Sequence, residues 1–177
     1  MNKNIYLIGM MGSWKSTAGR KLADHMDWDH VDTDDEIREN LKMSIREVFR
    51  YLGEDRFRTE ESSILKHLSL ETETIVSTGG GIVLDAGNRQ ILREKGYTIL
   101  LKAKPETLAG RIQKTSHRPL LKNDTNVFND LQKLWETRAA FYEDCAHFTL
   151  ITDDLDSNQV VTAIRKHLTE INAANQG

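Results

Sequence analysis

The stretch Leu7–Thr17, LIGMMGSWKST, decides how the rest of the chain is interpreted. It nearly matches a phosphate-binding loop, whose pattern is Gly, four variable residues, Gly, Lys, and then Ser or Thr. Gly9, Lys15 and Ser16 fall in place, whereas the position before the lysine holds Trp14. An apolar run precedes the loop and an amphipathic run follows it, which favours a nucleotide-binding loop over a glycine-containing turn with an exposed lysine.

The chemistry of such a loop follows from its backbone. The N–H groups of residues 12–16 are expected to point at the phosphates, helped by the dipole at the start of the following helix. The Lys15 ammonium is expected to reach the β- and γ-phosphates of ATP, and the Ser16 hydroxyl to bind Mg²⁺. The predicted nucleotide-binding residues of the loop are Gly12, Ser13, Trp14, Lys15, Ser16 and Thr17.

Trp14 departs from the pattern. Glycine is favoured at this position because the backbone often needs a positive φ and must approach the phosphate closely. For a residue with a Cβ, the left-handed conformation costs about 1–2 kcal/mol. We expect the fold to survive and the affinity for nucleotide to fall. The sequence leaves three explanations open: a weakened enzyme, a relative that no longer uses ATP well, or an introduced substitution.

Short apolar runs alternate with longer amphipathic stretches, which indicates an α/β fold with a mainly parallel sheet. Strands are expected at residues 4–9, 30–32, 97–102 and 148–152, and within residues 73–81 a further strand is expected to run into three glycines. Helices are expected at residues 16–26, 34–40, 44–68 with a break near Gly53, 86–95, after Pro105, 127–144 and 157–171. Ligands of such sheets bind at the carboxyl ends of the strands. The clusters at residues 9–16, 32–35 and 79–81 each follow a strand, so we expect them on one rim.

Composition limits the class of protein. The 177 residues fit one domain over residues 1–177, and 38% hydrophobic with 29% charged residues is typical of a globular protein. A net charge of −3 gives no basic field for nucleic acid. The lone Cys145 excludes an internal disulfide, and no apolar run approaches the roughly 20 residues that span a membrane. We expect a cytoplasmic protein with no nucleic-acid or membrane partner.

A second polar cluster, VDTDDEI at residues 31–37, follows the second predicted strand. Asp32 and Asp34 alternate there, so one can hold the water shell of a metal while the other receives a proton from an acceptor hydroxyl. Acids after a strand are also common at helix N-termini. That explanation is preferred for Asp35 and Glu36.

The chain as a whole resembles the shikimate kinase family, small P-loop kinases of the nucleoside-monophosphate-kinase-like group. The resemblance rests on six motifs in the family's order: the loop, DTD at 32–34, GEDRFRTEE at 53–61, STGGG at 77–81, HRPLL at 117–121 and RAAFYEDCA at 138–146. It implies ATP- and Mg²⁺-dependent phosphorylation of the 3-hydroxyl of shikimate, a step toward chorismate and the aromatic amino acids. It also implies a three-layer sandwich with a five-stranded parallel sheet of order 2-3-1-4-5, a shikimate-binding segment at about 33–61, a lid at about 112–125, and a monomer.

The resemblance assigns the acceptor side to matching residues. Arg58 and Arg138 would hold the shikimate carboxylate by charge-assisted hydrogen bonds. Asp34 would bind the ring hydroxyls and act as the base. The residues expected to let the ring approach the backbone are Gly79, Gly80 and Gly81.

It also assigns the nucleotide side. The lid residue Arg118 would close on the transferring phosphoryl group and neutralise its charge together with Lys15. Leu155 would pack against the base. The metal would be held by Ser16 and Asp32.

Two rival functions remain open. A related kinase for another small hydroxy acid, such as gluconate, would also use arginines for a carboxylate. A relative with a spoiled loop could instead keep the acceptor pocket and act as a binding or regulatory protein.

Overall fold

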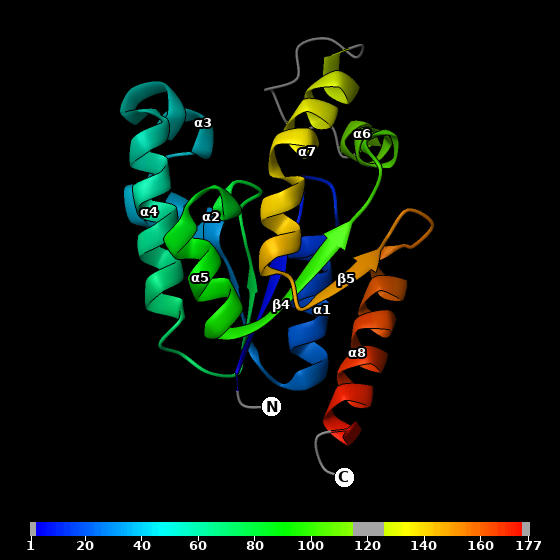
Figure 1. Cartoon of the computed structure of the whole chain (residues 1–177). Helices are drawn as coiled ribbons and strands as arrows, with labels where there is room; N and C mark the ends of the chain where they lie inside the picture. The colour runs from blue at the N-terminus through cyan, green and yellow to red at the C-terminus, as the bar shows by residue number, and fades with distance from the viewer. Residues whose placement is uncertain (1–2, 115–125, 175–177) are drawn as a thin grey trace.

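The computed structural model describes residues 3–114 and 126–174, and it confirms the α/β prediction (Figure 1). Within these residues one parallel sheet contains five strands in the order β2-β3-β1-β4-β5. The strands are β1 Asn4–Ile8, β2 Asp29–Asp32, β3 Thr74–Ser77, β4 Gly96–Lys102 and β5 Phe148–Ile151. The order is the one that the family resemblance implied.

The helices also lie close to their predicted positions. They are α1 Lys15–Met26, α2 Thr33–Leu41, α3 Ile45–Glu47, η1 Val48–Leu52, α4 Gly53–Leu68, η2 Ile82–Leu84, α5 Ala86–Glu94, α6 Pro105–Lys114, α7 Asn126–Cys145 and α8 Ser157–Ala174. The expected break near Gly53 is a π-helical turn, η1, after which Gly53 has a φ of 82°. The last helix runs on to Ala174, beyond the expected end at residue 171.

Two hydrophobic clusters make the protein a three-layer sandwich, as expected. Side chains of β1 alternate between them: Tyr6 and Ile8 join one cluster, and Ile5 and Leu7 join the other. The first cluster is covered by α2, α4, α5, α6 and α7, and the second by α1 and α8 (Figure 1). Period-two alternation along a strand buried on both faces therefore divides the core into two halves.

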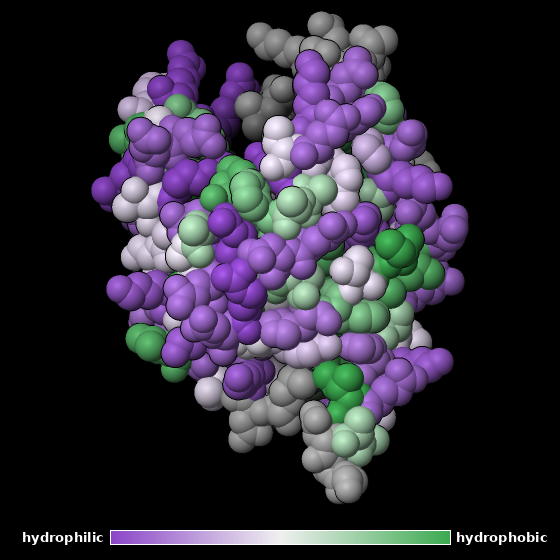
Figure 2. Space-filling view, viewed as in Figure 1, coloured by the Kyte–Doolittle hydropathy of each residue, from purple (hydrophilic) through white to green (hydrophobic). Residues whose placement is uncertain are grey.

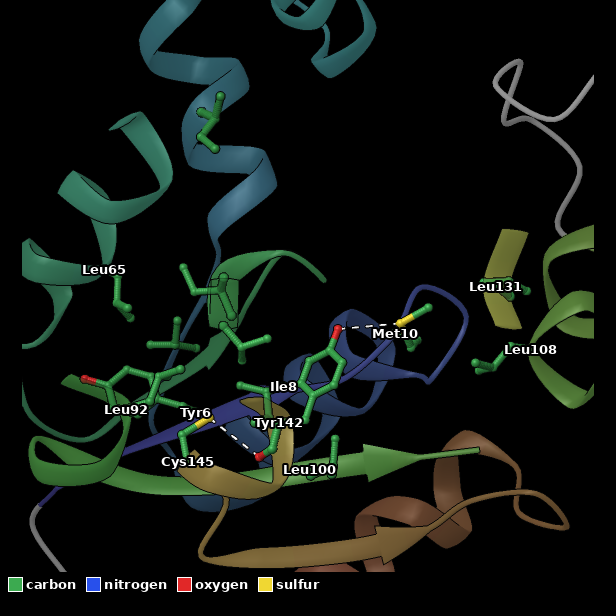
Figure 3. Packing of buried hydrophobic residues seen from close by; sticks show 14 of the residues in the cluster. Tyr6, Ile8, Met10, Leu65, Leu92, Leu100, Leu108, Leu131, Tyr142 and Cys145 are labelled. Atoms are coloured by element: carbon green, nitrogen blue, oxygen red, sulfur yellow. Dashed lines mark hydrogen bonds between the residues drawn. The ribbon is translucent and has the colours of Figure 1, made fainter. Parts of the chain in front are cut away.

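Helix α7 packs into the first cluster through Tyr142 and Cys145, as Figure 3 shows. The Tyr142 hydroxyl points toward Met10 Sδ at 3.7 Å, which brings α7 over the segment that follows β1. Cys145 is 1% exposed, and burial raises the pKa of its thiol to about 11. The cysteine therefore behaves as a small buried apolar residue.

The outward face over α4, α5 and α7 is mostly hydrophilic (Figure 2). Among the described residues, no helix combines the length and the apolar character that crossing a bilayer requires.

Hydrogen bonds tie β2 and the first residues of α1 and α2 to the carboxyl end of β3. The Ser77 hydroxyl, at the end of β3, donates to the Lys15 carbonyl at 3.0 Å. Because that hydroxyl has one proton, the nearby His30 Nε2, also 3.0 Å away, must donate to it from β2. One step further, the Gly79 N–H donates to Thr33 Oγ1 at 2.9 Å. These bonds fix the start of α1 and the start of α2 against the end of β3.

The close approach of α1 to this junction predicts the effect of a methyl group. A Cβ on Gly19 would collide with Ser77 Oγ and lie 2.8 Å from His30 Nε2. We expect Gly19→Ala to lower the free energy of unfolding by about 1–3 kcal/mol, because it forces the packed layers apart. Urea unfolding measures the change.

Gly110 provides the matched control, since it also lies inside a helix, but its Cβ would meet no atom of the described residues within 4 Å. Gly110→Ala should raise the free energy of unfolding by about 0.5–1 kcal/mol through helix propensity alone. Equal shifts for the two variants would contradict the packing explanation.

Candidate functional site

The phosphate loop, Gly9–Ser16, links β1 to α1 with the backbone that its pattern requires. Gly9 and Gly12 have φ values of 139° and 80°, and Trp14 has φ 73° and ψ 6°, the left-handed conformation expected at its position. The Lys15 ammonium donates to the carbonyls of Gly9 and Met10, both at 2.8 Å. The loop therefore curves around its own lysine, and α1 begins where the phosphates of a nucleotide would lie.

The indole of Trp14 lies on one side of this loop. The guanidinium of Arg111, from α6, stands over the indole ring with its Cζ 5.1 Å from the centroid. The ring packs against the second hydrophobic cluster, which Leu155 also contacts. Trp14 Nε1 is buried and has no hydrogen-bond partner among the described residues.

Charged side chains gather on the other side of the loop, around Gly79 and Gly81. A Cβ on Gly79 would collide with Glu61 Oε1 and lie 3.0 Å from Asp34 Oδ1. A Cβ on Gly81 would collide with the Arg58 guanidinium. These glycines therefore give room to the charged side chains of α2 and α4, a role that the sequence did not indicate.

Helix α7 supplies two further groups, both directed at the middle glycine. Arg138 Nη1 donates to the Gly80 carbonyl at 3.1 Å, and the Tyr142 hydroxyl donates to the same oxygen at 2.5 Å. Burial raises the pKa of Tyr142 to about 12, so the hydroxyl stays protonated and remains a donor. The guanidinium of Arg138 is thereby held beside the glycine run.

Glu61 controls the position of Arg58. The Glu61 side chain is 1% exposed, and its Oε2 accepts from Arg58 Nη1 at 2.7 Å. The other edge of the guanidinium donates to Glu54 Oε1 through Nε at 3.2 Å and Nη2 at 3.0 Å. Burial raises the pKa of Glu61, and nearby Asp34 raises it further, while the guanidinium groups of Arg58 and Arg138 lower it.

The oxygen groups proposed for a metal fit Mg²⁺. Asp32 Oδ1 accepts from the Asp34 N–H at 3.0 Å and caps α2, so the helix-start explanation is confirmed for Asp32 itself. Ser16 lies in the first turn of α1. In the described part of the chain no three His, Cys, Asp or Glu side chains form a metal cluster. Mg²⁺ in phosphate sites commonly takes only one or two protein oxygens and completes its shell with phosphate and water, and Ser16 and Asp32 offer such oxygens.

The structure brings most of the predicted residues to one rim, and Figure 2 shows a notch there between the α3–α4 end and the α7 end. Arg118 and residues 115–125 of the expected lid lie outside the described residues. Sequence reasoning gave no role to Glu61, Tyr142 or Arg111. Glu61 and Tyr142 stand three and four residues after the predicted arginines, a spacing that places side chains on one helix face. No sequence signal marks Arg111.

The buried Glu61 carboxyl predicts a dependence of stability on pH. Because burial raises its pKa, the stability that this group contributes is fully present below its ordinary pKa, about 4.3, and is lost as the pH rises through the raised value. We expect the native protein to lose stability relative to Glu61→Gln as the pH rises above about 4. Urea unfolding of both proteins at matched pH measures the difference, and the opposite slope would mean that pairing with Arg58 outweighs burial.

Comparison with known proteins agrees with this geometry. The family model described as shikimate kinase matches residues 11–169. A shikimate kinase from Caldicellulosiruptor saccharolyticus is 40% identical over 86% of this chain and 88% of its own length. One from Haemophilus influenzae is 36% identical over 98% of this chain and 96% of its own.

Solved structures extend the comparison to the fold. A shikimate kinase from Acinetobacter baumannii, solved in complex with shikimate, superposes with a TM-score of 0.89 at 31% identity, over 96% of this chain and 94% of that one. A gluconokinase from Sinorhizobium meliloti, at a TM-score of 0.63, 15% identity and coverage of 99% and 98%, shares the P-loop kinase fold alone. By motif, by sequence and by fold, the chain belongs to the shikimate kinase family.

Proposed function

We propose that the protein transfers the γ-phosphoryl group of ATP to the 3-hydroxyl of shikimate, with Mg²⁺ at the phosphates. The observation that carries the proposal is the placement of two guanidinium groups and a carboxylate around the glycine run, beside the phosphate loop. Arg58 lies against Gly81, Arg138 donates to the Gly80 carbonyl, and Asp34 lies against Gly79. A small acid with several hydroxyls matches this combination of charges.

On the acceptor side, Arg58 and Arg138 bind the carboxylate of shikimate through charge-assisted hydrogen bonds. The guanidinium of Arg58 is held by Glu61 and Glu54, and that of Arg138 by the Gly80 carbonyl. Because both arginines are held in place, they orient the shikimate ring. Asp34 orients the reacting hydroxyl and accepts its proton as the new O–P bond forms.

On the donor side, the amides at the start of α1 bind the phosphates, and the Lys15 ammonium exchanges its loop carbonyls for the β- and γ-phosphate oxygens. Ser16 and Asp32 would hold Mg²⁺, which supplies charge neutralisation at those oxygens. Arg118 is proposed to reach the same phosphoryl group, a role that rests on the family resemblance. We propose that the protein acts as a monomer.

An assay of ADP release with shikimate and with gluconate tests the choice of acceptor. We expect turnover with shikimate and none above background with gluconate. Turnover of gluconate without shikimate would overturn the proposal. Isothermal calorimetry separates the remaining alternative, since shikimate binding without any nucleotide binding at millimolar concentration would indicate a binding protein.

Arg138→Lys tests the carboxylate site. Lysine keeps the charge but loses the planar paired donors, so KM for shikimate should rise roughly 10- to 100-fold. KM for ATP should change by less than about threefold, because the contact lies on the acceptor side. Arg165→Lys, on the exposed side of α8, is the control and should change neither constant. An equal rise in both KM values for Arg138→Lys would indicate general damage to the site.

A further inference from the structure

The order of the strands divides the candidate site into two sides. The acceptor groups follow β2 and β3, and the phosphate loop follows β1 in the middle of the sheet. Phosphoryl transfer places the attacking and leaving oxygens roughly in line through the γ-phosphorus. The nucleoside part of the donor must therefore extend away from the acceptor, over the ends of β4 and β5.

Arg111 is fixed on that second side. Its guanidinium donates to Thr152 Oγ1 at 3.2 Å and to the Leu155 carbonyl at 3.2 Å, both in the segment after β5. It also donates to the Thr152 carbonyl. A guanidinium held in this way offers a flat cationic face, which stacks on an indole or a purine equally well.

The flat face is already in contact with a ring of the protein itself. The Trp14 indole lies under Arg111 with 5.1 Å between Cζ and the ring centroid, and it packs on the cluster that Leu155 contacts. We infer that this indole occupies the slot over the flat face of Arg111, beside residues 152–155, in which the base of the nucleotide would otherwise stack. The inference rests on the proposed function in that it takes a nucleotide as the donor.

The backbone of Trp14 leads to the same conclusion. Its φ of 73° is the conformation that the loop requires. The steric strain of a left-handed residue with a Cβ is therefore already present in the folded protein, and phosphate binding does not add to it. The effect of Trp14 on nucleotide binding therefore comes from the ring. The protein recognises the polyphosphate chain of its donor and draws little affinity from the base, which makes position 14 a determinant of donor specificity.

Calorimetry with ADP, GDP and inorganic tripolyphosphate, each with excess Mg²⁺, tests the inference. The native protein should bind ADP and GDP with affinities within about threefold of each other. Trp14→Ala and Trp14→Gly should each bind ADP roughly tenfold more tightly, the scale of one stacked base, while binding of tripolyphosphate changes less than about twofold. Trp28→Ala, at the other end of α1 against the same cluster, is the control and should leave all three affinities unchanged.

Three results would overturn the inference. If only Trp14→Gly binds ADP more tightly, the effect of position 14 comes from the backbone. If both variants gain affinity for ADP and for tripolyphosphate equally, the effect comes from the phosphate loop. If neither variant binds ADP more tightly than the native protein, the base does not bind in this slot. Urea unfolding confirms that each variant is folded, and if Trp14→Ala unfolds, the comparison of ADP with tripolyphosphate on Trp14→Gly still decides.

The outcome is independent of the acceptor. Shikimate is titrated separately into the same proteins, and Trp14→Ala should bind it as the native protein does. If the native protein does not bind shikimate, the proposed function is wrong. The change in ADP affinity relative to the change in tripolyphosphate affinity would still decide the role of Trp14.

Discussion

The Ser77 hydroxyl sets the position of the phosphate loop relative to the acceptor side of the sheet. It donates to the Lys15 carbonyl and accepts from His30, so the first residue of α1 is tied to β3 and, through it, to β2. Gly19 makes this contact possible, because any side chain there would displace the hydroxyl. A misplacement of about 1 Å between reacting groups can cost two orders of magnitude in rate, so a single short side chain has a large influence on the site.

The charged groups of the acceptor side depend on one another in the same way. Glu61 is buried at a cost, which shows in its raised pKa, and the pairing with Arg58 offsets part of that cost. In return the carboxylate holds the guanidinium against the glycine run. Asp34 and Arg138 complete a set with two carboxylates and two guanidinium groups. Substitutions within this set should therefore not be additive.

At position 14 the backbone and the side chain have different effects. The loop keeps its left-handed residue although that residue is a tryptophan, and the cost of φ is absorbed by the packing of the indole on the second cluster and under Arg111. The loop geometry is therefore that of a phosphate site. The same packing that stabilises the ring places it on the side where we infer that the nucleoside binds.

The sequence by itself determined the loop, the alternation of strands and helices, and the family, because these follow from local periodicity, capping and motif spacing. It also placed the phosphate loop, Asp34 and the glycine run on one rim, since parallel strands end at the same edge, whereas Arg58 and Arg138 were assigned from the family resemblance. Only the tertiary structure decided which side chains fill the spaces beside Gly79 and Gly81, and that Arg111 lies over Trp14. Those contacts join residues far apart in the chain through the packing of separate layers, and no local pattern encodes them.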